Sequence, residues 1–463
     1  MAVEAAGRQV VAVDRDRLAA RLEHEAEAFR RSHPRSLELS ERSRSSLLLG
    51  VPMSWMARWA GDFPVFVKEA RGARVVDVDG HEYVDLCLGD TGAMAGHAPE
   101  PVVQAMAAQA ARGSTAMLPT EDAAWVGEEL ARRFGLPFWQ FALSATDANR
   151  FALRLAREVT GRGKVLVFDW CYHGSVDEAL AATQFGVVGP RAGNVGPPVH
   201  PALTTKVVQF NDLDALEQAL RARDVACVLA EPALTNIGIV LPDDGFHDAL
   251  RELTRTTGTL LAIDETHTLS AGPGGCTRAW SLEPDIVSVG KAIGGGMPAA
   301  AFGVSAELAE RVAERTDADY EDTGGIGGTL AGNALSLAAV RATLEHVLTE
   351  ETFAHTIPLA ERFATDVAET IEGEALPWHV TRLGCRAEYR FRPTAPRTGA
   401  DAADAIDDEL DRYMHLYALN RGVLLTPFHN MALISPATTL ADVETHSAVF
   451  AGAVEELRDT ASK

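Results

Sequence analysis

The chain has 463 residues, of which 47% are hydrophobic and 23% are charged. This is the balance of an ordinary globular protein, and it excludes a disordered, collagen-like or coiled-coil architecture for the bulk of the chain. The net charge of −23 at pH 7 repels phosphate backbones and anionic lipids. We therefore expect neither a nucleic acid nor a membrane as a partner.

The cysteines and the N-terminal sequence both bear on the cellular compartment. An odd and sparse set of cysteines without a C-x-x-C pair suits a reducing compartment. The first residues carry acids and arginines where a signal peptide needs an apolar run, and no run of about 18 apolar residues occurs anywhere. We therefore expect a cytoplasmic protein. The five cysteines are Cys87, Cys171, Cys227, Cys276 and Cys385.

The first segment, residues 1–94, is predicted to contain a helical arm. Residues 13–48 are rich in Arg, Glu, Leu and Ala, and Leu18, Leu22 and Phe29 share one side of a helix. The arm either packs against the body of the protein or a second subunit, or is frayed, and the sequence leaves both possibilities open.

A hairpin is predicted at the end of this segment. Residues 73–86 hold two β-rich runs on either side of Asp79-Gly80, a dipeptide that is typical of a tight turn between antiparallel strands. We expect this hairpin and the arm to pack with the C-terminal part of the chain.

Residues 95–335 are predicted to form the large domain. Short apolar runs alternate with helical patterns, and strands that are apolar on both faces are typical of a mostly parallel sheet covered by helices. Helices are expected at 100–112, 121–134 and 147–161, and strands at 138–144, 164–168, 205–210, 225–230, 259–264 and 285–290.

The third segment, residues 336–463, is predicted to be a smaller α+β domain. Long helical patterns cover residues 332–372, and a charged helix is expected at 407–422. Between and after them, residues 384–393 and 423–435 have the pattern of strands.

Ligands of α/β proteins bind at the carboxyl ends of the strands, and four predicted strand ends carry unusual residues. Small and hydroxyl residues at 144–148 begin a helix, where backbone N–H groups can hold a phosphate, although an ordinary helix cap is the favoured explanation of this segment taken alone. Tyr172, followed by His173 and Gly174, can stack on a heteroaromatic ring, although it can also be a core residue.

The other two strand ends carry charges in apolar surroundings. Asp264 directly follows four apolar residues, and a buried carboxylate needs a cation or hydrogen-bond donors. Lys291 lies between an apolar strand and a triple-glycine loop, and a desolvated lysine can act as an amine nucleophile that forms a Schiff base. A strand-end acid that caps a turn and a solvated lysine remain the structural alternatives.

Together the four strand ends predict one site. Pyridoxal 5′-phosphate requires a phosphate-binding cup, a stacking aromatic, an acid that pairs with the pyridine nitrogen and a lysine that forms the aldimine. A hydrolytic metal site of Asp264, Glu265 and His267 is disfavoured, because alternate strand residues face opposite sides and no second ligand cluster supports it. A Rossmann dehydrogenase lacks its glycine motif, and a non-catalytic sensor would most simply have lost the lysine.

The sequence resembles the fold-type I, class III pyridoxal-phosphate aminotransferases, most closely the glutamate-1-semialdehyde aminomutase-like group. The resemblance covers residues from about 50 to the C-terminus. It implies a seven-stranded, mostly parallel sheet between helices, a smaller α+β domain from both chain ends, and a homodimer with shared active sites. The most specific segments are 284–303, with 141–157, 171–174, 230–242 and 327–339 also matching.

The resemblance also implies roles for individual residues. Lys291 would form the aldimine, and Asp264 would pair with the pyridine nitrogen. Thr329 would reach the phosphate of the neighbouring subunit. The other cofactor-binding residues that it implies are Ser144, Ala145, Thr146, Tyr172, His173, Glu231, Asn236 and Thr266.

The chain departs from the family pattern where the substrate would bind. Trp55 stands where relatives place an arginine, with Arg58 nearby, and the segment with Phe428 and His429 lacks an expected acid. These residues, Trp55, Arg58 and His429, are the predicted substrate contacts. They favour a ping-pong transaminase with an aromatic or bulky apolar pocket, and an intramolecular aminomutase or racemase is the alternative.

Overall fold

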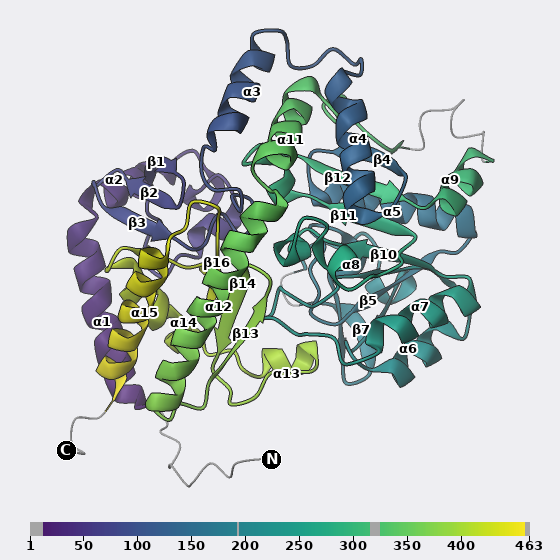
Figure 1. Cartoon of the computed structure of the whole chain (residues 1–463). Coiled ribbons are helices and arrows are strands. Elements are labelled where there is room, and N and C mark those ends of the chain that lie inside the picture. Colours follow the sequence, from purple (N-terminus) through teal and green to yellow (C-terminus); the bar gives the residue numbers. More distant parts are fainter. Residues whose placement is uncertain (1–12, 192–193, 315–324, 459–463) are drawn as a thin grey trace. The chain divides into compact units, whose positions relative to one another are not determined.

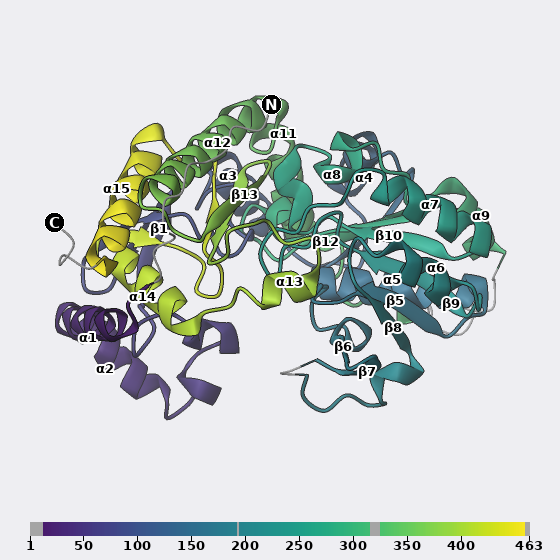
Figure 2. The same ribbon diagram turned by 90° about the horizontal axis from the view of Figure 1, so that it is seen from below.

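The computed structural model describes residues 13–191, 194–314 and 325–458 and divides the chain into two compact units (Figures 1 and 2). One unit combines the N-terminal segment with two later segments, and the other contains the middle of the chain. The first unit is Met1–Asp90, His355–Ala395 and Ala405–Lys463, and the second is Thr91–Ala354 and Pro396–Asp404.

A seven-stranded sheet forms the centre of the second unit (Figure 1). Only β12 is antiparallel to its neighbours, so six strands share one direction, and the predicted fold class is confirmed. In spatial order the strands are β4 (Phe138–Ala142), β12 (Ala300–Val304), β11 (Ile286–Val289), β10 (Leu260–Asp264), β9 (Val225–Ala230), β5 (Lys164–Phe168) and β8 (Thr205–Val208).

Helices cover this sheet because its central strands are apolar on both faces. Every residue of β9, β10 and β11 is buried, which requires a layer on each side. Helix α5 (Ala145–Thr160) packs against five of the strands, whereas α6 (Leu213–Leu220) and α7 (Phe246–Thr257) pack on β8 and β10. Helix α5 begins two residues earlier than predicted, because Ser144 caps it.

The remaining elements of the second unit surround the sheet. Helix α11 packs against α3 and α4, as Figure 1 shows, and β6 and β7 form a hairpin that the sequence did not predict. These elements are α3 (Glu100–Ala110), α4 (Glu121–Phe134), β6 (Ala181–Gln184), β7 (Val187–Pro190), α8 (Gly275–Ala279), α9 (Ala306–Ala313), α11 (Ala334–His346) and α13 (Gly399–Ala403).

The first unit contains two smaller sheets. In one, β15 from the C-terminal part pairs in parallel with β3 from the N-terminal part, so residues more than 300 positions apart form one sheet. The strands are β1 (Val67–Arg71), β2 (Arg74–Asp77), β3 (Glu82–Asp85) and β15 (Val423–Leu424) in the first sheet, and β13 (His379–Leu383), β14 (Arg386–Arg390) and β16 (Met431–Leu433) in the second.

The predicted hairpin is confirmed. Strands β2 and β3 are antiparallel, and Gly80 in the turn between them has a φ of 96°. This left-handed conformation favours glycine, because a Cβ atom would clash with the backbone there. The Asp79 side chain accepts hydrogen bonds from the N–H groups of Arg35 and Ser36, which joins the turn to the N-terminal arm.

The N-terminal arm is folded against its own unit, so the frayed alternative is wrong. Its first helix packs against α14 and α15, and Leu18 and Phe29 are fully buried. The helices of this unit are α1 (Arg15–Ser32), α2 (Pro34–Ser43), α12 (Glu350–Gly373, which begins in the second unit), α14 (Asp408–Leu419) and α15 (Leu440–Leu457), with short 3₁₀ turns at Leu48–Gly50 and Ser54–Ala57.

Two further features concern the chain as a whole. All five cysteines are buried and free. Among the helices that the structure describes, none combines the length and the apolar character needed to cross a bilayer.

Candidate active site

A cavity of about 320 Å³ lies at the carboxyl ends of the strands in the second unit. It collects residues from the ends of β4, β5, β9, β10 and β11, as expected for an open α/β sheet. The lining residues are Gly92, Leu143, Ser144, Ala145, Thr146, Tyr172, His173, Gly174, Glu231, Asp264, Thr266, His267, Lys291, Gly296, Met297, Pro298 and Ala299.

Asp264 ends β10 and is held by three donors. His173 Nδ1 lies 2.9 Å and Asn149 Nδ2 lies 2.8 Å from Asp264 Oδ2, and the Thr266 N–H donates to Oδ1 at 3.0 Å. Burial alone would raise the pKa of this carboxyl, but the hydrogen bonds and the charge of His173 lower it to about 2. Asp264 is therefore a buried, permanently ionised group in the cavity wall.

His173 completes this pair from the segment after β5. Burial alone would lower the pKa of His173, but Cys171 and the Asp264 carboxylate outweigh it and raise the pKa well above its usual range. Among the described residues, His173 Nε2 has no hydrogen-bond partner although it is buried. The Thr266 hydroxyl, which also lines the cavity, shares this feature. Both atoms are available to a polar ligand.

Lys291 follows β11 in a strained backbone conformation. Its φ of 48° is unusual for a residue with a side chain, and such strain is concentrated at functional sites. Gly290 allows the loop to approach α5, because a Cβ atom there would lie 3.0 Å from Ala145 Cβ. The Lys291 side chain reaches His267, with 2.6 Å between Nζ and Nε2.

The first turn of α5 has the geometry of an anion cup. Ser144 Oγ accepts a hydrogen bond from the Asp147 N–H at 3.2 Å, so the capping explanation of this serine also holds. The cup is narrow, because a Cβ atom at Gly174 would lie 2.1 Å from Thr146 Oγ1. N–H groups in the first turn have no partner within the helix and can bind a phosphate.

Glu231 connects two parts of the cavity wall. Its Oε1 accepts from the N–H of Tyr172 at 3.3 Å, and its Oε2 accepts a short hydrogen bond from the Thr235 hydroxyl. Thr235 Oγ1 lies 2.7 Å from His267 Nδ1. Glu231 therefore holds the predicted stacking aromatic and, through Thr235, the histidine beside Lys291.

The structure brings most, but not all, of the predicted cofactor residues together. Asn236 is absent from the cavity lining and lies half-buried after β9. Thr329 is exposed and borders a different hollow beside α5 with Ala142, Asp147 and Phe151. A role for Thr329 in a neighbouring subunit stays a prediction.

The three predicted substrate residues belong to the first unit. The rings of Trp55 and Phe428 lie 4.6 Å apart, and the Arg58 guanidinium lies 5.6 Å from the centre of the Trp55 ring. His429 is buried, with Nδ1 at 3.1 Å from Glu388 Oε1. Their contact with a substrate stays a prediction.

Three residues of the site were missed in the sequence. Asn149 and Thr235 were not considered, and His267 was weighed only as a metal ligand. The available signal for Asn149 was a polar residue on the apolar face of a helix, between Ala148 and Phe151, where an amide needs a buried partner. Nothing local in the sequence marks Thr235.

A metal site at the end of β10 is not supported. Glu265 is buried and accepts from the hydroxyls of Thr268 and Thr277, away from the partners of Asp264. Within the described ranges, Asp264, Glu265 and His267 do not bring their ligand atoms together. The donors that line the cavity instead fit pyridoxal phosphate, since they combine an ionised acid, an amine, an anion cup and two unpaired polar atoms.

Comparison with known proteins identifies the family. The aminotransferase class-III profile matches residues 55–450. The chain belongs to the class-III aminotransferase family. A glutamate-1-semialdehyde 2,1-aminomutase of Desulfitobacterium hafniense is 34% identical over 423 residues, which cover 89% of this chain and 95% of that protein. The predicted family, its fold-type I architecture and its cofactor, pyridoxal phosphate, are thereby confirmed.

Solved structures give the same result. A glutamate-1-semialdehyde aminomutase from Pseudomonas aeruginosa, crystallised with PMP, is 52% identical with a TM-score of 0.95, over 97% of this chain and all of that one. An omega-transaminase from Sphaerobacter thermophilus is 29% identical with a TM-score of 0.82, over 92% of this chain and 98% of that one. The chain is therefore a class-III enzyme that depends on pyridoxal phosphate.

Proposed function

We propose that this protein is an intramolecular aminomutase of the glutamate-1-semialdehyde type, which moves an amino group between adjacent carbons of one substrate. The observation that carries the proposal is the 52% identity to an aminomutase structure over nearly the whole chain. The aminomutase was the alternative in the sequence analysis, and the relatives favour it over the transaminase.

The side chains of the cavity suit this chemistry. When bound, pyridoxal phosphate supplies an electron sink for the substrate carbon that loses its proton. In our proposal the Lys291 amine holds the cofactor and then carries the proton between substrate carbons as base and acid. Asp264, which is oriented by His173 and Asn149, would keep a proton on the ring nitrogen of the bound cofactor.

The remaining cavity residues position the cofactor. The N–H groups around Ala145 and Thr146 would hold the phosphate. The Ser144 hydroxyl, which donates to Asp147 Oδ2 at 2.9 Å, would have to leave that carboxylate to join them. Tyr172 would stack on the ring, and its backbone is fixed by Glu231. The buried His173 Nε2 and Thr266 Oγ1 offer polar contacts that the protein itself leaves open.

A transaminase is the second candidate, and one observation favours it. Trp55 and Phe428 form an aromatic pair, and they come from the two segments in which the family resemblance places substrate contacts. Aromatic contacts of this kind suit a large apolar amine better than an acidic substrate.

A direct assay distinguishes the two functions. Purified holoenzyme is given glutamate-1-semialdehyde alone, and the formation of 5-aminolevulinate is measured. This product is the isomer in which the amino group is on the former aldehyde carbon. Formation without an added keto acid supports the aminomutase. Turnover that occurs only with a separate amino donor and keto acceptor contradicts the aminomutase and supports the transaminase.

We also propose a cytoplasmic homodimer with shared sites, in which Thr329 contacts the cofactor phosphate of the neighbouring subunit. The exposed position of Thr329 beside α5 is compatible with this. Dilution below the dimer dissociation constant should then release cofactor and activity together. A monomer that keeps its cofactor would contradict the shared site.

A further inference from the structure

A chain of four buried or partly buried side chains leads from the cavity lysine to a carboxylate. Lys291 Nζ lies 2.6 Å from His267 Nε2, and His267 Nδ1 lies 2.7 Å from Thr235 Oγ1. Thr235 in turn makes a short hydrogen bond to Glu231 Oε2. His267, Thr235 and Glu231 are each at least 94% buried, since their exposed fractions are 6%, 0% and 2%.

The hydrogen bonds in this chain have a defined direction. A carboxylate only accepts, so the single proton of the Thr235 hydroxyl is directed to Glu231. The same hydroxyl oxygen must then accept from His267, which places the imidazole proton on Nδ1. The lone pair of His267 therefore lies on Nε2 and faces Lys291.

We propose that Glu231 and Thr235 set the resting tautomer of His267, with its Nε2 lone pair towards Lys291, so that His267 accepts a proton from Lys291 at Nε2 and later returns it. In this scheme His267 is a positioning residue that takes up the proton that the lysine releases when its amine reacts. The inference rests on the proposed function in one respect, namely that Lys291 is the lysine that bonds to the cofactor.

The relay balances in protons and charge. One proton leaves Lys291 Nζ and binds His267 Nε2, the Nδ1 proton passes to Thr235 Oγ1, and the hydroxyl proton passes to Glu231. Each transfer breaks one bond to hydrogen and forms another, and no electrons are exchanged. The ammonium and the carboxylate become an amine and an acid, so the buried net charge is unchanged, which low polarity favours.

The charged groups around His267 come from three strand ends. Glu231 follows β9, with Oε2 at 3.9 Å from His267 Nδ1, and Lys291 follows β11. Asp264 ends β10 and is engaged by His173 and Asn149, while the neighbouring Glu265 carboxylate is satisfied by Thr268 and Thr277. Glu231 is therefore the carboxylate that the relay connects to His267.

The test measures how fast cofactor-free, full-length enzyme takes up pyridoxal phosphate between pH 6 and 10, followed by the absorbance of the lysine adduct. Thr235→Val removes the hydroxyl but keeps the shape, and Thr235→Ser is the matched control that retains it. We expect uptake by Thr235→Val to be about tenfold slower at pH 7, with its pH midpoint about one unit higher, whereas Thr235→Ser follows the wild type.

Uniform slowing at every pH, or an unshifted midpoint in Thr235→Val, would overturn the relay, because a merely structural role moves the rate and not its pH dependence. His267→Gln provides the same test if Thr235→Val does not fold, since an amide cannot relay a proton in this pH range.

If Lys291→Ala still forms the adduct, the lysine assignment fails instead. If uptake is as expected but no aminolevulinate forms, only the substrate assignment fails.

Discussion

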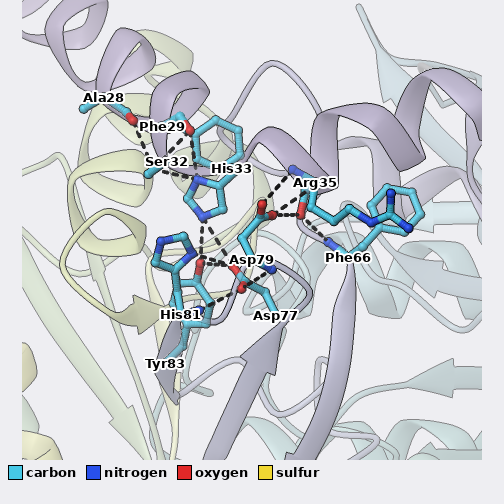
Figure 3. Close-up of polar contacts among 11 residues, drawn as sticks. Ala28, Phe29, Ser32, His33, Arg35, Phe66, Asp77, Asp79, His81 and Tyr83 are labelled. Carbon is cyan, nitrogen blue, oxygen red and sulfur yellow. Dashed lines mark hydrogen bonds and ion pairs between the residues drawn. The ribbon is translucent and has the colours of Figure 1, made fainter.

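The molecule contains two buried clusters in which a histidine meets an aspartate, and they differ in what they leave unpaired. In the first unit, Asp77 accepts from the N–H groups of Asp79 and His81, from His81 Nδ1 and from the Tyr83 hydroxyl (Figure 3). In the second unit, Asp264 accepts from three donors, and its partner His173 lines a cavity and keeps a buried Nε2 without a partner among the described residues.

The first cluster also contains His33, whose Nε2 lies 3.4 Å from Asp77 Oδ2. The pKa values of His33 and His173 are shifted in opposite directions. Burial lowers the pKa of His33, whose Nδ1 bonds to the Phe29 carbonyl and whose Nε2 bonds to the Tyr83 hydroxyl. The pKa of His173 is raised by its neighbours instead. The first cluster joins the N-terminal arm to the β2–β3 hairpin (Figure 3), whereas the second lines a cavity.

By the proximity of its side chains, the first cluster nonetheless resembles a metal site. His33, Asp77 and His81 bring three ligand atoms within 4.8 Å of one another. These atoms are already used in hydrogen bonds that hold the chain together, as Figure 3 shows. Proximity of suitable residues is therefore a weaker sign of function than unpaired polar atoms at a cavity.

The largest expected effect is at Lys291. In the proposed mechanism, replacement by alanine would remove both the covalent link to the cofactor and the proton carrier, so turnover should fall by about 10⁴-fold or more. Borohydride treatment followed by mass spectrometry should find no cofactor attached to the chain. Near-normal turnover in this variant would show that the Lys291 cavity, which the Asp264 cluster lines, is not the active site.

The next effect is at Asp264. Asp264→Asn should leave a folded protein with kcat reduced by about 10²–10³-fold, because a neutral amide cannot keep the ring nitrogen protonated. The low pKa of Asp264, about 2, also predicts that its charge does not limit activity between pH 5 and 9. Steady-state kinetics measures this loss. If kcat stayed within about twofold of the wild type, Asp264 would have a structural and not a catalytic role.

Asp77→Asn is the matched change in the first cluster, and it should affect stability instead of catalysis. The amide cannot accept from all four donors, so we expect the free energy of unfolding to fall by about 2 kcal/mol. Denaturant unfolding measures this loss, and kcat per folded enzyme should be unchanged. A loss of kcat without a loss of stability would mean that the two clusters do not divide the roles as inferred.

The smallest effect concerns His446, another buried histidine with a nitrogen that has no partner among the described residues. Its Nδ1 has no described partner, and its ring lies 4.3 Å from that of Phe363. Burial lowers its pKa to about 3. Below about pH 6.5 the histidine is therefore protonated in the unfolded chain but stays neutral in the folded one.

His446 should therefore cost stability as the pH falls. Between pH 7.5 and 5.5 the cost should be about 1.4 kcal/mol, and His446→Phe should remove that part of the acid sensitivity. Unfolding measured at both pH values tests it, and an equal pH dependence in both proteins would refute the assignment. The activity of the variant should be normal, since an unpaired atom packed in a core has no access to ligand.

The sequence predicted that Asp264 and Lys291 share one site, and both line the same cavity, because strand ends have a local signature. An apolar run that ends in Asp264, and another that ends at Lys291, place both groups at the same edge of a parallel sheet whatever the details of packing. The hairpin around Gly80 was equally local, because its turn depends on two adjacent residues.

The tertiary structure decided which partners those groups have. Asn149 reaches Asp264 across 115 positions, His267 and Thr235 lie 32 positions apart, and β15 joins β3 from the other end of the chain. Asn236 and Thr329 match family motifs, yet neither lines the Lys291 cavity in the described chain. Burial and hydrogen-bond direction depend on every element packed around a residue. Local sequence therefore specifies which group a strand end carries, and packing specifies its protonation and what it can do.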